Sequence, residues 1–238
     1  MIKRHIPNAI TCCNLISGCT AIVFALYGQP TMALLFIVIG ALFDFCDGFA
    51  ARLLKVSSPI GKELDSLADV VTFGVAPSAM LYNHLLQMDL HAAYPAALAS
   101  VLPFVAFVMA AFSALRLAKF NLDERQTTSF LGLPTPANAL FWASLLIWIK
   151  QQPAMPQYVE WMLLALMVVS CWLLVSEVPM FALKFKHKGW TGNELRYGFI
   201  LLSAAVIIWA GPIYAWAVII SLYVIISVIQ SLIGKHKS

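Results

Sequence analysis

Charged side chains are scarce in this sequence of 238 residues: they make up 11% of the chain, whereas 61% of it is hydrophobic. A soluble globular domain usually carries about 25% charged residues. The apolar runs have no polar faces, so a large soluble core is excluded. No low-complexity tract, internal repeat or soluble domain is visible either. We therefore expect a single membrane domain over residues 1–238.

Metal-binding cysteine motifs and a nucleic-acid-binding pattern are also absent. The five cysteines fall in apolar segments without metal-ligand spacing, where free cysteine usually acts as a small core residue. The net charge of +4 comes without a basic patch interleaved with exposed aromatic residues, so we expect no nucleic-acid partner. The first residues imitate a signal peptide, but no small-residue cleavage site follows, so we expect the first apolar run to be a membrane span.

Long apolar runs fill most of the chain instead. A membrane-spanning helix needs about 20 mostly apolar residues, and this rule predicts an all-α polytopic membrane bundle of about eight helices. Six helices form the core over about 1–177, and a C-terminal pair follows over about 196–233. The last two spans are short and separated by Gly211-Pro212, so one bent hairpin is an alternative there. The predicted spans are 9–28, 32–53, 65–86, 96–118, 132–150, 159–177, 196–211 and 213–233.

Basic residues are distributed unevenly between the loops. If successive loops lie on alternate sides of the membrane, 14 of the 15 Lys and Arg residues fall on one side and only Lys150 falls on the other. Cytoplasmic loops of membrane proteins are enriched in Lys and Arg. We therefore expect a multi-pass protein of the cell's inner (cytoplasmic) membrane, with both termini in the cytoplasm. Tryptophans such as Trp142 and Trp161 mostly lie near predicted span ends, as in an aromatic belt.

Four aspartates lie in one short block at the edges of the second and third spans, in a chain with only 11 acidic residues: Asp44, Asp47, Asp65 and Asp69. Carboxylates near or within a bilayer are costly and rarely persist there without a counter-ion or a function. Spacings of three and four residues place each pair on one face of a helix. Two such helices facing each other would gather four carboxylates. This much like charge is stable only around cations, and hard ions such as Mg²⁺ prefer oxygen ligands.

Small residues at helical spacing accompany these aspartates. The stretch from Asp44 to Asp69 reads D-x-x-D-G-x-x-A-R-x(8)-G-x-x-x-D-x-x-x-D. This pattern resembles the signature of the CDP-alcohol phosphatidyltransferases. Salt bridges from the aspartates to Arg52, Lys55 and Lys62 are the structural alternative, but they leave the glycines and the alanine unexplained.

The aspartates fall into two predicted roles. Asp44, Asp47 and Asp65 can supply oxygen ligands to two Mg²⁺ or Mn²⁺ ions, an arrangement that suits in-line phosphoryl displacement. Asp69 is the candidate general base for the proton of the attacking hydroxyl, and the resemblance implies this role for the fourth aspartate. Asp69 as a further metal ligand is left open.

Four other motif positions are candidates for binding CDP-diacylglycerol, the substrate that the resemblance implies. Gly48 and Ala51 carry little or no side chain, so a nucleotide could pack flush against the helix. Arg52 offers a planar donor fork that suits phosphate oxygens. Gly61 adds flexibility to the link between the two predicted helices and begins the second of them.

Two pairs of polar residues outside the motif have both a functional and a structural interpretation. Asn8 and Thr11 face the bundle interior, where they either contact the nucleotide and pyrophosphate or form interhelical hydrogen bonds. Arg116 and Lys119 either bind the phosphate or carboxylate of a substrate or extend to lipid headgroups.

Further stretches resemble one subfamily, the membrane-embedded bacterial phosphatidylserine synthases. The resemblance implies transfer of a phosphatidyl group from CDP-diacylglycerol to L-serine, with release of CMP, by a homodimer. Glycerol 3-phosphate or inositol are alternative acceptors, and a cation transporter using the aspartates is the alternative from another class. Two positions depart from the pattern: Lys119 stands where we expect Arg, and residues 175–179 follow only loosely. The similar stretches are 6–11 with Asn14 and Ser17-Gly18, 65–77, 114–121 and 132–137.

Overall fold

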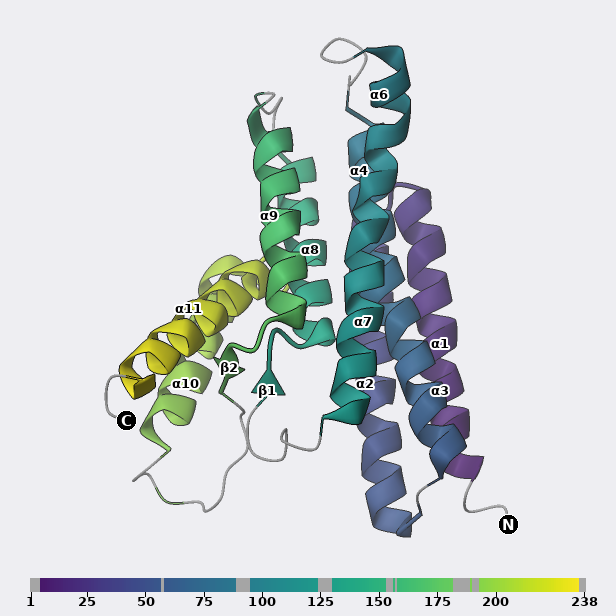
Figure 1. Ribbon diagram of the computed structural model, residues 1–238, viewed down its shortest axis with the longest axis vertical. Coiled ribbons are helices and arrows are strands. Elements are labelled where there is room, and N and C mark those ends of the chain that lie inside the picture. Colours follow the sequence, from purple (N-terminus) through teal and green to yellow (C-terminus); the bar gives the residue numbers. More distant parts are fainter. Residues whose placement is uncertain are drawn as a thin grey trace.

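Long helices make up most of the computed structural model (Figure 1). The structure describes residues 5–56, 58–88, 95–123, 130–152, 156, 158–181, 189 and 193–235. Two short strands, β1 (Phe130–Leu131) and β2 (Pro179–Met180), pair antiparallel. The helices are α1 (His5–Leu26), α2 (Pro30–Leu54), α3 (Pro59–Asp69), α4 (Ala76–Leu86), α6 (Ala96–Val101), α7 (Val108–Leu122), α8 (Thr135–Lys150), α9 (Tyr158–Val175), α10 (Glu194–Ala210) and α11 (Ala215–Lys235), with a π-helical segment η2 (Val70–Val75) and a 3-10 segment η3 (Leu102–Phe107).

The predicted all-α membrane fold is confirmed, and the helical rods follow the predicted spans closely. α3, η2 and α4 form one continuous rod, as do α6, η3 and α7. The largest difference is at the third span, which begins at Pro59 and not near residue 65. Ser58 explains this start, because its side chain accepts a hydrogen bond from the Gly61 N–H and Pro59 suits the first helical turn. Asp65 therefore lies inside the helix.

Six of the described rods are long and apolar enough to cross a membrane: α1, α2, the two composite rods, α9 and α11. α8 and α10 are shorter, with 16 and 17 residues. A helix rises about 1.5 Å per residue, so each spans about 24–26 Å of the ~30 Å hydrocarbon core. The chain is thus a multi-pass helical membrane protein, and full crossing by α8 and α10 stays a prediction.

Close packing of small residues brings α1, α2 and η2 together. An ideal Cβ on Gly18 of α1 would lie 2.8 Å from Thr72 Cα, and one on Gly40 of α2 would lie 2.5 Å from Thr72 Cγ2. Small residues are typical of such contacts in membranes, because they let helix backbones approach closely. The buried residues of α1 lie on one face of the helix: Pro7, Thr11, Asn14, Ser17, Gly18, Ala21 and Ala25.

Contacts between loops gather at the two ends of the bundle. At one end, Lys150 Nζ donates to the Gly28 carbonyl and the Tyr214 hydroxyl donates to Gln151 Oε1. At the other end, Lys62 Nζ of α3 donates to a backbone carbonyl near the end of α7. The described loops therefore alternate between the ends, as the predicted topology requires. Several basic residues used in that prediction lie outside the described residues: Lys3, Arg4, Arg125, Lys184, Lys186, Lys188 and Lys237.

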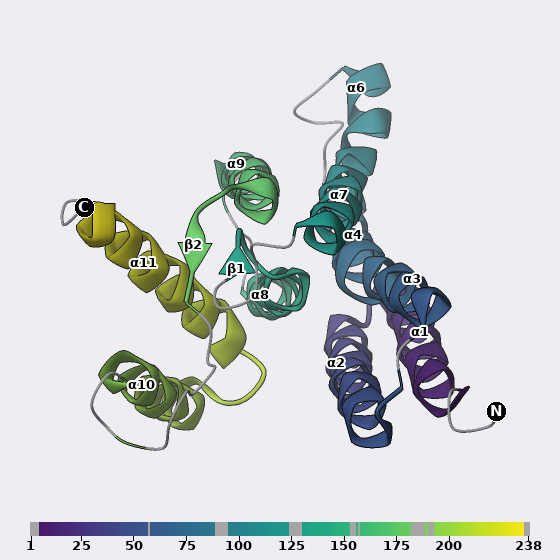
Figure 2. The same cartoon turned by 60° about the horizontal axis from the view of Figure 1, so that its bottom comes forward.

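The C-terminal helices α10 and α11 lie beside the rest of the bundle (Figure 2), and their side chains contribute to a second hydrophobic cluster. α10 and α11 are separate helices joined through Gly211, whose φ of 79° lies in the left-handed region that favours glycine. Phe199 and Tyr223 pack there with Met180 of β2. The Tyr223 hydroxyl donates to the Phe181 carbonyl at 3.0 Å, so α11 also holds the segment that follows α9.

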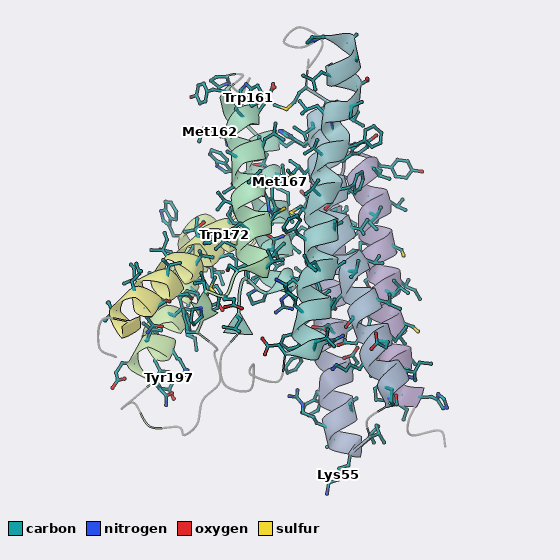
Figure 3. The ribbon with its side chains drawn as sticks, in the orientation of Figure 1. Lys55, Trp161, Met162, Met167, Trp172 and Tyr197 are labelled. Atoms are coloured by element: carbon teal, nitrogen blue, oxygen red, sulfur yellow. The ribbon has the colours of Figure 1, made fainter. Side chains whose placement is uncertain are left out.

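The outer faces of the bundle are apolar, as expected for lipid contact (Figure 3). Trp161 and Trp172 of α9 point away from the bundle and are more than half exposed, whereas Met167 of the same helix is buried. Trp142 differs from these residues. It is fully buried, and its Nε1 donates to Ser170 Oγ at 3.0 Å, so its predicted place in an aromatic belt is wrong.

Candidate active site

Three aspartates from two helices come together on facing sides of α2 and α3. Asp44 and Asp47 lie on α2, and Asp65 lies on α3. One carboxylate oxygen of each lies within 4.8 Å of those of the other two. Residues three apart share a helix face, so one face of α2 presents both of its aspartates to α3. We call these three residues the carboxylate cluster.

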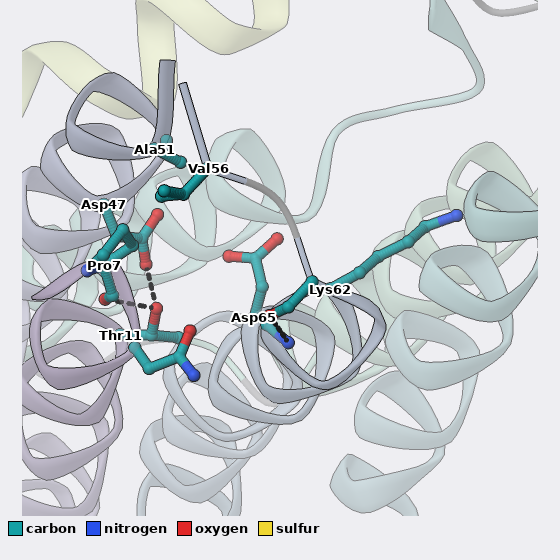
Figure 4. Close-up of a pocket in the computed structure, with 11 residues that line it drawn as sticks. Pro7, Thr11, Asp47, Ala51, Val56, Lys62 and Asp65 are labelled. Carbon is teal, nitrogen blue, oxygen red and sulfur yellow. Dashed lines mark hydrogen bonds between the residues drawn. The ribbon is translucent and has the colours of Figure 1, made fainter. Parts of the chain in front are cut away.

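A threonine on α1 holds one member of the carboxylate cluster (Figure 4). Thr11 Oγ1 lies 2.6 Å from Asp47 Oδ2 and 3.0 Å from the Pro7 carbonyl oxygen. The hydroxyl acts as the donor, because both partners are acceptors. Asp47 is 6% exposed, and a buried carboxylate needs such a donor. Thr11 thus forms the interhelical hydrogen bond that was one of its two interpretations.

A cavity of about 270 Å³ lies beside the carboxylate cluster (Figure 4). Asp47 and Asp65 contribute to its wall. At Gly48 an ideal Cβ would meet nothing within 4 Å, so the surface of α2 is open there. The cavity is also lined by most of the residues predicted to bind CDP-diacylglycerol: Asn8, Thr11, Gly48, Ala51 and Gly61.

Two motif positions differ from expectation. Arg52 does not line this cavity and is exposed on α2, because each residue turns the helix by about 100°. Gly61 does not begin the helix but lies in its first turn, where an ideal Cβ would be 3.1 Å from Asn8 Oδ1. Lys62 lines the cavity as well, and its Nζ donates to the Asn121 carbonyl at 2.8 Å. From the sequence, Lys62 was expected only as a basic loop residue and a salt-bridge partner.

Asp69 lies one helical turn beyond Asp65, outside the carboxylate cluster. It is 8% exposed, and its Oδ1 accepts a hydrogen bond of 3.1 Å from Asn14 Nδ2 of α1. This contact of Asn14 was not predicted from the sequence. The signal was its position three residues after Thr11, on the same face of the first helix. Asp69 therefore has surroundings different from those of the other three aspartates.

Arg116 and Lys119 line a second cavity, of about 390 Å³, between α7 and the end of α9. Arg116 is only 7% exposed, and its guanidinium carbon lies 4.9 Å from the centre of the Phe120 ring. A buried arginine facing a cavity fits substrate binding better than extension to headgroups. Lys119 is exposed and compatible with both interpretations.

The donor set of the carboxylate cluster fits a divalent metal ion. Asp65 Oδ1 is buried and has no hydrogen-bond partner among the described residues. Leaving a buried acceptor unpaired is costly. Hard cations such as Mg²⁺ take carboxylate oxygens as ligands, so a bound ion would satisfy this atom.

The fold and this site define a membrane-embedded enzyme whose carboxylates suit a metal ion. The chain belongs to the CDP-alcohol phosphatidyltransferase family, whose model matches residues 4–175. The family is metal-dependent, in agreement with the carboxylate cluster.

Three relatives that bear the name CDP-diacylglycerol–serine O-phosphatidyltransferase are similar to large parts of the chain. The protein of Bacillus subtilis (strain 168) is 43% identical over 137 residues, 56% of this chain and 70% of the relative. The protein of Mycobacterium leprae (strain TN) is 34% identical over 231 residues, 94% of this chain and 70% of the relative. The protein of Helicobacter pylori (strain 26695) is 30% identical over 226 residues, 94% of this chain and 90% of the relative.

Proposed function

We propose that this chain transfers the phosphatidyl group of CDP-diacylglycerol to L-serine, releasing CMP and forming phosphatidylserine. Membership of the family supports the type of reaction. The choice of L-serine as acceptor rests on the relatives whose names state that activity. The structural observation that carries the proposal is the carboxylate cluster beside a cavity that α1, α2 and α3 line.

The cytidine and pyrophosphate of CDP-diacylglycerol would occupy the cavity next to the carboxylate cluster. Gly48 and Ala51 keep the surface of α2 low there, so a nucleotide can pack against the helix. Asn8 adds an amide that can contact the nucleotide or the pyrophosphate. The exposed position of Arg52 does not support its predicted contact with phosphate.

Asp44, Asp47 and Asp65 would hold Mg²⁺ or Mn²⁺, and we propose two ions. Metal bound there supplies positive charge to the phosphate oxygens during in-line displacement. The protein fixes the carboxylates for this purpose, because Thr11 orients Asp47 and the spacing along α2 aligns Asp44 with it.

Asp69 would accept the proton of the serine hydroxyl as the serine oxygen attacks the phosphorus of the phosphatidyl group. A general base has to lie within hydrogen-bond reach of the proton that it receives. Asp69 lies one turn from Asp65 and outside the carboxylate cluster, which supports a role other than that of a primary ligand. Additional ligation of metal by Asp69 is the alternative.

The second cavity would bind the acceptor. The guanidinium of Arg116 offers a planar donor fork to the serine carboxylate, and Lys119 adds a second positive charge.

The same proposal includes the location and assembly of the enzyme. Residues 1–238 would form one domain of the inner (cytoplasmic) membrane, with the termini and the active site facing the cytoplasm. This orientation is supported by the basic residues, because 14 of the 15 Lys and Arg residues fall on the side assigned to the cytoplasm and only Lys150 does not. The family resemblance supports a homodimer, which chemical cross-linking in membranes would test.

Release of CMP by the purified protein in detergent tests the reaction. With CDP-diacylglycerol and Mg²⁺ or Mn²⁺, release should require L-serine, should match phosphatidylserine formed, and should stop on addition of a chelator. Release of CMP with glycerol 3-phosphate or inositol, but not with serine, would show that the acceptor is a different alcohol and would leave the proposed phosphatidyl transfer standing. No release with any of the three alcohols would contradict the proposal.

A further inference from the structure

A chain of buried hydrogen bonds leads from η2 through α1 to Asp69. Thr72 Oγ1 lies 2.8 Å from Asn14 Oδ1, and Asn14 Nδ2 lies 3.1 Å from Asp69 Oδ1. Thr72 Oγ1 is also 3.1 Å from the Asn14 carbonyl oxygen. Asn14 and Thr72 are both fully buried. Neither residue has a part in the reaction described above, although Asn14 contacts the proposed general base directly.

The partners of Asn14 fix the direction of its amide group. An amide donates at its nitrogen and accepts at its oxygen. The Thr72 hydroxyl donates to the amide oxygen, so the nitrogen faces Asp69. The reversed amide would bring its oxygen against a carboxylate oxygen, where neither atom can donate. Asn14 can therefore offer Asp69 a proton donor in one orientation only.

Thr72 is itself held by the packing of three rods. Side chains are excluded at Gly18 and Gly40 because ideal Cβ atoms there would collide with Thr72. Thr72 lies in the π-helical segment η2, three residues after Asp69, and both residues bond to Asn14. π-helical turns inside α-helices occur frequently at functional sites. The fold thus fixes both ends of the hydrogen-bond chain on one rod and its middle on another.

We propose that Asn14 is a positioning residue, which holds the Asp69 carboxylate in the orientation that receives the proton of the acceptor hydroxyl, and that Thr72 sets the direction of the Asn14 amide. This inference rests on the proposed function. The alternative is a purely structural hydrogen bond between helices. That bond would contribute to stability, but its loss would leave the rate per folded active site unchanged.

Three substitutions separate these roles: Asn14→Ala, Thr72→Val and Thr72→Ser. Asn14→Ala removes the donor to Asp69, and Thr72→Val removes the hydroxyl while keeping the shape of the side chain. We expect each to lower kcat by about 10- to 100-fold, the loss typical when a hydrogen-bond partner that orients a metal-ligating side chain is removed. KM for CDP-diacylglycerol should change by less than about threefold, because neither residue lines the nucleotide cavity. Thr72→Ser keeps the hydroxyl and should retain most of the activity.

A double substitution tests whether Asn14 acts through Asp69. In an Asp69→Asn background, Asn14→Ala should add little further loss of kcat, since the group that it positions is already gone. Ser113→Ala is the matched control, because it also removes a buried hydroxyl packed against η2, one whose hydrogen bond among the described residues is to Met109 O within α7. Its kcat should stay close to that of the wild type, because the Ser113 hydroxyl has no bond to Asn14, Thr72 or Asp69 among the described residues.

Rates are to be divided by the active fraction, measured as bound CDP-diacylglycerol per protein. Near-wild-type kcat for Asn14→Ala, or equal losses for Thr72→Val and Thr72→Ser, would overturn the inference. If Asn14→Ala is not recovered as folded protein, the kcat values of Thr72→Val and Thr72→Ser decide between the positioning role and the purely structural one. Absence of CMP release by the wild-type protein would contradict the proposed function itself, which is a separate outcome.

Discussion

Asp65 combines a buried oxygen that lacks a hydrogen-bond partner among the described residues with two neighbouring carboxylates. Without a cation this arrangement places like charges together in a region of low dielectric. We therefore expect Asp65→Asn to reduce CMP release to background while the protein remains inserted and folded. The amide replaces one charged ligand, and packing between the rods does not depend on that charge.

Glu63→Gln is the matched control for Asp65→Asn, because Glu63 is an exposed acid on the same helix and outside the carboxylate cluster. Its CMP release should equal that of the wild type. Isothermal titration with Mn²⁺ should show weakened binding for Asp65→Asn alone. Near-wild-type turnover of Asp65→Asn would show that the carboxylate cluster is not the metal site.

For Asp69 we make a different prediction, because it lies outside the carboxylate cluster and accepts a hydrogen bond from Asn14. If it is the general base, Asp69→Asn should lose about 10²–10⁴-fold in turnover, the usual contribution of general-base assistance. Binding of CDP-diacylglycerol in the presence of metal should be largely kept. Single-turnover CMP release alongside isothermal titration measures both quantities. A loss of binding in place of rate would make Asp69 mainly a metal ligand.

Individual residues also show how far spacing within the sequence can be used. The spacing of Asp44 and Asp47 predicted one acidic face on α2, and the structure brings that face to Asp65. Spacing does not fix how one helix is rotated against its neighbours. For that reason the exposed position of Arg52 and the bond between Asn14 and Asp69 were not predicted.

At the scale of elements, the crossing of α1, α2 and η2 depends on two glycines. Gly18→Ala and Gly40→Ala should each place a methyl group against Thr72. Overpacking of a well-packed contact usually costs about 1–3 kcal/mol, so we expect lower thermal unfolding temperatures in detergent. Turnover should fall as well, because Thr72 is displaced from Asn14.

Gly198→Ala is the corresponding control on α10. An ideal Cβ at this helical glycine meets nothing within 4 Å. Alanine is the better helix former by about 0.5–1 kcal/mol, so stability should be unchanged or slightly raised. Equal destabilisation by all three substitutions would show that the close approach to Thr72 has no special importance.

The elements themselves were predictable in number and approximate bounds, because long apolar runs have few alternative structures in a bilayer. Their internal geometry was not. The apolar pattern of the sequence is the same with or without the π-helical segment η2 and the 3-10 segment η3, so it does not predict them. The buried site of Trp142 was not predicted either, since α8 lies inside the bundle and not at its edge.

For the whole molecule, the distribution of charge and the contacts between loops agree on two distinct ends. Lys62 and the cavity that it lines lie at one end, and Lys150 bonds to the turn between α1 and α2 at the other. A serine arriving from the cytoplasm can reach the second cavity only if the first of these ends faces the cytoplasm. The direction of insertion therefore decides whether the proposed reaction has access to its soluble substrate.

Cysteine reporters test that direction in a background without the five native cysteines. Gln29→Cys probes the turn after α1, and Glu63→Cys probes the first turns of α3; both positions are exposed. Enrichment of Lys and Arg in cytoplasmic loops predicts that a membrane-impermeant thiol reagent added to intact cells labels position 29 alone. Position 63 should be labelled only after the membrane is opened, and this second step also proves that the reporter is reactive. Labelling of both positions from outside would overturn the topology, and with it the cytoplasmic route proposed for serine.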